Sequence, residues 1–161
     1  MSIRASTVRG GGDEPERTRR PAANLILSGL MAIAFAVGLR RAQTHGPGAR
    51  WAPRLIAGFG VGLVAAGIFR ADPLLGFPLG TPQGPTPISW HGLLHFAAGG
   101  IGFTCLAIGC LNLARRYAVE GRRAWARFCR MTGLAFLAGF AMVAASTGGS
   151  RVATIAFTAA V

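Results

Sequence analysis

Long apolar stretches separated by short polar segments dominate the chain. Four of them, residues 22–39, 52–69, 90–114 and 126–146, are long enough as helices to cross the roughly 30 Å hydrocarbon core of a bilayer. A fifth apolar stretch, residues 152–161, covers only about 15 Å as a helix. The pattern predicts an all-α fold, a polytopic transmembrane helical bundle with four full spans and a partial fifth.

The segments outside these stretches are polar or rich in glycine and proline. Residues 1–20 show no apolar periodicity and are predicted to form a disordered tail, which leaves residues 21–161 as the transmembrane domain. The loop at residues 71–89 contains five prolines, so neither a helix nor a central strand can persist there. Ser89 ends this loop directly before the third stretch, where a serine is a favourable N-cap.

The composition agrees with a membrane location. Hydrophobic residues make up 52% of the chain and charged residues 14%, against about 25% charged in an average soluble domain. The basic residues are 17 arginines, and with five acids they give a formal net charge of +12. A nucleic-acid-binding domain gathers its arginines on one polar face, whereas these lie in blocks between apolar stretches. We therefore expect the lipid bilayer, and no nucleic acid, as the partner.

The distribution of arginine predicts the orientation in the membrane. Two of the connecting segments, taken with the adjoining ends of the stretches, carry ten arginines: Arg40, Arg41, Arg50, Arg54, Arg115, Arg116, Arg122, Arg123, Arg127 and Arg130. The segment around the loop 71–89 has Arg70 balanced by Asp72. Because arginine-rich loops stay in the cytoplasm, we expect a cell-membrane protein whose proline-rich loop faces outward. This assignment places the N-terminal tail outside as well.

Small residues and cysteines indicate how the helices pack. Gly58, Gly62 and Ala66 recur at every fourth position of the second stretch, and such a stripe lets another helix approach closely. We interpret it as an intramolecular packing face, although small-residue faces could also bind another membrane protein. The three cysteines lack CxxC spacing and are interpreted as small apolar packing residues. They are Cys105, Cys110 and Cys129.

An unusual motif runs from the second stretch through the proline-rich loop into the third. It consists of Gly67-Ile68-Phe69-Arg70-Ala71-Asp72-Pro73, Gly76-Phe77-Pro78, Gly80-Thr81-Pro82, and Trp90-His91-Gly92 followed by His95. The motif resembles the bacterial integral membrane family known as domain of unknown function 998, over roughly residues 24–145. The resemblance implies a membrane bundle of about six helices and implies no activity. By this resemblance the chain is expected to be a truncated member of the family.

Three residues of the motif are candidates for metal binding. His91 and His95 are four positions apart on a predicted helix, so their rings share a face about 6 Å apart. Asp72 begins the adjoining loop, and two histidines with a carboxylate suffice for a catalytic zinc. The alternative is structural: His91 and His95 would be interfacial or hydrogen-bonded helix residues, and Asp72 would form a turn with the local backbone.

The sequence leaves the function open between three hypotheses. The leading one is an uncharacterised multi-pass membrane protein with a non-catalytic structural or accessory role. The alternative is an intramembrane metal-dependent hydrolase that uses Asp72, His91 and His95 at the outer interface, with a divalent metal such as zinc. A transporter component is the third, although no internal repeat or mid-span acid is visible. Since no phosphate loop or GxSxG motif occurs, nucleotide enzymes and soluble hydrolases are not supported.

Overall fold

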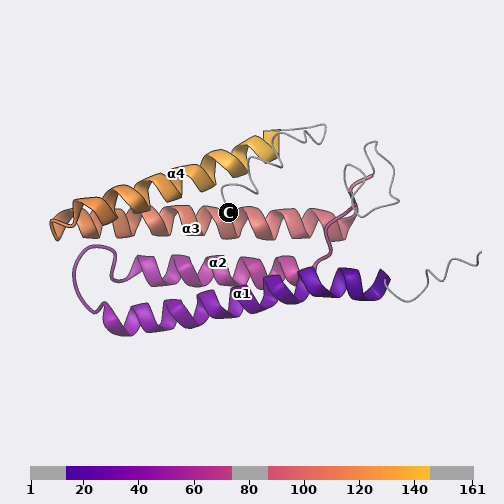
Figure 1. Cartoon of the computed structure of the whole chain (residues 1–161), viewed down its shortest axis with the longest axis horizontal. Helices are drawn as coiled ribbons and strands as arrows, with labels where there is room; N and C mark the ends of the chain where they lie inside the picture. Colours follow the sequence, from indigo (N-terminus) through magenta and orange to yellow (C-terminus); the bar gives the residue numbers. More distant parts are fainter. Residues whose placement is uncertain (1–13, 74–86, 146–161) are drawn as a thin grey trace, which may run out of the picture.

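Four helices make up the fold in a computed structural model of the chain, which describes residues 14–73 and 87–145 (Figure 1). They are α1 (Glu14–Ala42), α2 (Trp51–Ile68), α3 (Trp90–Val119) and α4 (Arg123–Ala145). No strand occurs in these residues. The all-α prediction is confirmed.

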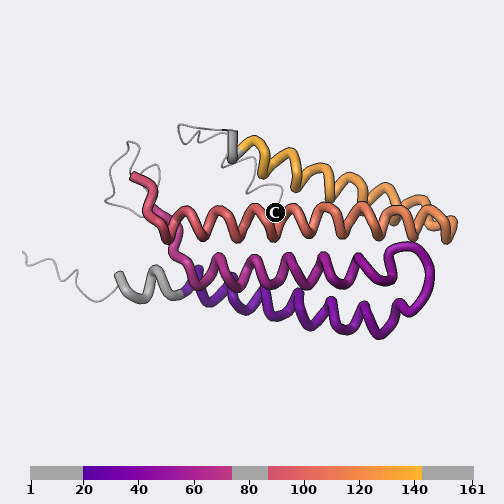
Figure 2. Tube along the Cα trace, turned by 180° about the vertical axis from the view of Figure 1, so that it is seen from behind, coloured from indigo at the N-terminus to yellow at the C-terminus, as the bar shows by residue number. Residues whose placement is uncertain are grey.

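The helices lie in a single row, in the order in which they follow one another along the chain. Within the described ranges, α1 contacts α2, α2 contacts α3 and α3 contacts α4, and no other pair of helices is in contact. The views from opposite sides show the same antiparallel row (Figures 1 and 2). The row therefore has two broad faces that no other described helix covers.

Three of the helices are long and apolar enough to cross a membrane, namely residues Arg20–Ala42 of α1, all of α2, and all of α3. The protein is therefore membrane-embedded. The predicted fourth span corresponds to α4, which is not among these three and whose first half carries Arg123, Arg127 and Arg130. The predicted partial fifth span, residues 152–161, lies outside the described residues.

Two helix boundaries differ from the predicted ones by five residues or more. Helix α1 begins at Glu14, so the last part of the tail predicted as disordered is helical. A first turn with a proline and two acidic residues is a favourable helix start, and apolar periodicity carries no information about such residues. Helix α3 continues past Ala114 to Val119, since arginine is a good helix former. The turn that follows α3 contains Gly121 with a φ of 74°.

Small residues form the interior of the row. In the described part of the chain no large side chain is fully buried, and no polar or charged residue is buried. The buried hydrophobic residues are Ala36, Ala52, Ile56, Ala66, Ala107, Ala114, Ala126 and Cys129. In a bilayer, where apolar side chains gain little by leaving lipid, such small residues let helices associate through close backbone packing.

Helix α2 packs through two different glycine faces. A Cβ atom added to Gly60 would lie 2.6 Å from the carbonyl oxygen of Gly29 on α1. On the other face, a Cβ added to Gly62 would lie 2.7 Å from the Cα of Gly102 on α3, and Gly58 abuts Cys105. The second face contains the stripe that the sequence indicated. Its interpretation as an intramolecular packing face is confirmed.

Replacing Gly62 by alanine tests this packing. The new methyl group would overlap backbone atoms of Ala98 and Gly102, so α2 and α3 must separate, and we expect a loss of about 1–3 kcal/mol. Gly99→Ala is the matched control, because a Cβ there meets no atom within 4 Å and alanine favours the helix. Melting temperatures in a mild detergent should fall for Gly62→Ala only. Equal effects of the two substitutions would contradict the packing described.

Candidate functional site

The residues of the sequence motif meet where α2 ends and α3 begins. Helix α2 ends at Ile68 and α3 begins at Trp90, and the two termini lie at the same end of the row (Figure 1). The end of an α-helix leaves backbone carbonyl groups without partners, and its start leaves N–H groups without partners. In a membrane protein such groups are costly unless other groups bind them.

Asp72 and Ser89 bind each other and cap the start of α3. The backbone N–H of Ser89 donates to Oδ2 of Asp72 at 2.7 Å, and the Ser89 hydroxyl donates to Oδ1 at 2.5 Å. The same hydroxyl oxygen accepts the N–H of Gly92 at 3.0 Å, as expected for a serine N-cap. The carboxylate therefore stands at the positive end of the α3 dipole.

Gly92 is required by the position of this carboxylate. A Cβ atom at residue 92 would overlap Oδ2 of Asp72, so no larger residue fits without displacing the acid. Gly92 is buried in the first turn of α3. The acid and the glycine of the motif, 20 positions apart in sequence, are thus explained by a single contact.

The two hydrogen bonds from Ser89 hold Asp72 in its charged form. The Ser89 hydroxyl, then the Ser89 backbone N–H, and to a smaller degree the nearby His91, lower the pKa of the Asp72 carboxyl from its ordinary value. The ionised side chain is therefore the form that the cap uses. Its contribution to stability is present above the ordinary carboxyl pKa and is lost as the pH falls through the lowered one.

His95, on α3, binds backbone carbonyl groups at the end of α2. Its Nδ1 lies 2.7 Å from the carbonyl oxygen of Ala66 and 2.9 Å from that of Phe69. Both neighbours are acceptors, so Nδ1 carries the proton and donates to them. Across this junction a residue from the start of α3 caps the end of α2, and Asp72, which follows α2, caps the start of α3. We call these contacts the reciprocal cap.

His91 lies outside the reciprocal cap and is exposed. Its ring lies against that of Trp90, with centroids 3.6 Å apart and the ring planes tilted by 32°, and approaches the ring of Phe69 at 6.2 Å. Trp90 is exposed and begins α3, a position typical of tryptophan at a membrane interface.

The three residues predicted to bind a metal thus have other partners. Asp72 accepts hydrogen bonds from Ser89, and Nδ1 of His95 donates to two backbone carbonyl groups. The ring of His91 lies against that of Trp90. In residues 14–73 and 87–145 no group of three His, Cys, Asp or Glu side chains could hold a metal ion. Coordination by all three would require Asp72 to leave Ser89 and His95 to bind through Nε2. The metal site stays a prediction that the arrangement does not favour.

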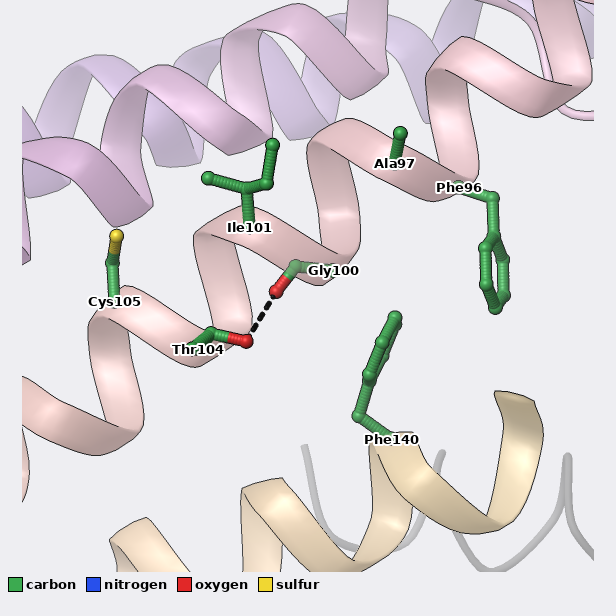
Figure 3. A pocket seen from close by; sticks show the side chains of 7 residues that line it. All are labelled: Phe96, Ala97, Gly100, Ile101, Thr104, Cys105 and Phe140. Carbon is green, nitrogen blue, oxygen red and sulfur yellow. Dashed lines mark hydrogen bonds between the residues drawn. The ribbon is translucent and has the colours of Figure 1, made fainter. Parts of the chain in front are cut away.

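An open groove of about 440 Å³ lies along α3 where it faces α4. Phe96 and Phe140 both line it, with their rings stacked at a centroid distance of 5.3 Å, and the thiol of Cys105 points towards α2 (Figure 3). The Thr104 hydroxyl donates to the Gly100 carbonyl oxygen at 2.8 Å, so it is already satisfied (Figure 3). The lining supplies an apolar surface, and its one hydroxyl is not paired with a base that could activate it.

Sequence reasoning found the residues of the reciprocal cap but not their pairing. It identified Asp72, His91 and His95 as a candidate metal site and Ser89 as an N-cap, yet it did not join Asp72 to Ser89. The signal was present, because an acid just after one helix and an N-cap serine just before the next are common capping residues. The contacts of His95 with the α2 carbonyl groups had no such signal.

The pH dependence of stability tests the Asp72 contact. In the unsubstituted chain, acid should remove the stabilisation from Asp72, since protonation removes the charge that accepts both Ser89 bonds. Asp72→Asn should be less stable at neutral pH and should lack this loss below about pH 4. Ser89→Ala should cost about 1 kcal/mol as a lost N-cap. Melting curves in detergent at several pH values measure these effects. If the melting temperature of Asp72→Asn falls in acid as much as that of the unsubstituted chain, the contact is refuted.

Comparison with known proteins identifies the family of the chain. The family described as "Protein of unknown function (DUF998)" matches residues 10–161. Neither a curated protein nor a solved structure gives a match. The match covers nearly the whole sequence, including all four helices and the reciprocal cap, and agrees with the motif in the loop between α2 and α3. The chain belongs to the DUF998 family of proteins of unknown function.

Proposed function

We propose that this protein is a non-catalytic structural or accessory subunit of a larger helical membrane assembly. The observation that carries the proposal is the single row of helices, in which α1 and α4 each contact one neighbour in the described part. Large apolar side chains cover its surface instead of filling an interior. Met31 on α1 is 72% exposed and Met131 on α4 is 67% exposed. A row with open sides is suited to packing against further helices.

The chemistry of the described residues supports the same role. Asp72 and His95 of the motif are engaged in capping, and the groove along α3 offers an apolar surface without an activated nucleophile. A hydrolase would need a reactive group beside a base, and a transporter would need polar groups at the middle of the membrane. In the described part of the chain no polar or charged residue is buried.

The proposal includes a definite topology. Helix α4 is taken as a fourth membrane span, with the first half of its length amphipathic, and residues 152–161 as the start of a fifth. The ten arginines at the α1–α2 and α3–α4 connections favour a cytoplasmic location for that end of the row. The reciprocal cap and the proline-rich loop then face outward from the cell membrane.

Photo-crosslinking tests the role as a subunit. A photoreactive amino acid at Met31 or at Met131 samples the two outer helices of the row, and one at Thr44 in the α1–α2 connection is the control. We expect an adduct of defined mass with a protein, either a second copy or another membrane protein, at one helix or both. The same adduct should be absent at Thr44. Adducts with lipid alone at both helices would contradict the proposal.

Cysteine labelling in intact cells tests the topology. Pro87 and Thr44 are exposed and stand at opposite ends of the row. With an impermeant maleimide, Pro87→Cys should react in intact cells, and Thr44→Cys should react only after permeabilisation. The unsubstituted chain gives the background, because Cys105, Cys110 and Cys129 lie within α3 and α4. The reverse pattern would overturn the orientation.

A further inference from the structure

The described structure concentrates positive charge at one end of the row. The end formed by the α1–α2 connection and the α3–α4 turn carries ten arginines and one described carboxylate, Glu120. That carboxylate already accepts a bond from Nε of Arg116 at 2.7 Å. Arg116 also donates to the carbonyl oxygen of His45 at 3.0 Å, so it ties the α1–α2 connection to α3. The other arginines of this end have no carboxylate of the described chain to neutralise them.

Three of these arginines form a stripe on α4. Arg123, Arg127 and Arg130 are spaced by four and three residues, so they project from the same side of the helix, and all three are exposed. Leu134, at the next position of this side, is 54% exposed. The stripe extends about 10 Å along the helix from its first turn. In the proposed topology it reaches from the interface into the edge of the hydrocarbon.

Aromatic rings fix the depth at which the stripe begins. The Cζ atom of Arg122 lies 5.0 Å from the ring centroid of Tyr117 and 5.8 Å from that of Trp125. Trp125 is exposed, and exposed tryptophan and tyrosine at helix ends mark the level of lipid headgroups. A guanidinium over a ring keeps its N–H edge free for a phosphate. Arg122 is thus placed at headgroup level, beside the start of the stripe.

From this geometry we propose that Arg122 and the α4 stripe bind the headgroups of anionic phospholipids in the leaflet at the arginine-rich end. Arginine presents a planar fork of donors that fits a phosphate, and its apolar stem lies along the helix while its head reaches outward. The phosphates supply the counter-charge that the described chain lacks at this place. The proposal rests on the topology above, in which α4 spans the membrane.

Native mass spectrometry of the full chain in a neutral detergent tests the proposal, with phosphatidylglycerol as the probe and phosphatidylcholine as the neutral lipid. We expect the unsubstituted chain to bind phosphatidylglycerol more tightly and to lose this preference at high salt. Replacing Arg123, Arg127 and Arg130 together by glutamine should weaken binding roughly 100-fold. Equal affinity for the two lipids, or displacement of phosphatidylglycerol by millimolar inorganic phosphate, would overturn the proposal.

A matched variant separates a local site from total charge. Replacing Arg40, Arg41 and Arg50 by glutamine removes the same charge from the same end but leaves α4 intact, and it should have a much smaller effect. Equal losses in the two triple variants would refute a site on α4. Lysine at the three stripe positions keeps the charge without the planar fork, so this variant should bind phosphatidylglycerol more tightly than the glutamine variant and less tightly than the unsubstituted chain. Binding no tighter than that of the glutamine variant would also refute the proposal, independently of the crosslinking and labelling results.

Discussion

The close approach of α2 to both of its neighbours is the constraint on which the rest of the structure depends. Gly60 leaves no room for a side chain against Gly29 of α1, and Gly62 leaves none against Gly102 of α3. Backbones at this distance gain dispersion contacts that lipid cannot offer equally well, and this gain replaces the hydrophobic effect inside a bilayer. Because the interior consists mostly of glycine and alanine, most of the large side chains lie on the faces and sides of the row.

The reciprocal cap acts on the same pair of helices. Glycine contacts bring α2 and α3 together along their length, and the cap fixes their relative position at one end. His95 binds carbonyl groups at the end of α2, while Asp72 and Ser89 bind N–H groups at the start of α3. Near hydrocarbon, unpaired backbone groups cost several kcal/mol each, so side chains that pair them are required for stability. Asp72, Ser89 and His95 of this region therefore have a structural role, which is to pair the backbone groups at the ends of α2 and α3.

At the arginine-rich end, helix α4 differs from the other three helices in the residues with which it begins. Helices α1, α2 and α3 present apolar surfaces long enough to span a membrane, whereas α4 begins with an exposed stripe of arginines. Such a stripe is costly in pure hydrocarbon and favourable beside phosphates. The proposed contact with anionic headgroups would place α4 correctly in depth and would keep this end of the row in the cytoplasmic leaflet.

The sequence by itself determined the class of fold, the approximate helices and the packing stripe on α2, because hydropathy, proline and small-residue spacing act locally along the chain. It also located the residues of the reciprocal cap. Only the tertiary structure decided that Asp72 binds Ser89 instead of joining His91 and His95, and that His95 donates to the end of α2. The spacing of His91 and His95 is compatible with a metal site and with a cap. The difference lies in which acceptors the neighbouring helix places within hydrogen-bonding distance, and residue spacing on one helix carries no information about that.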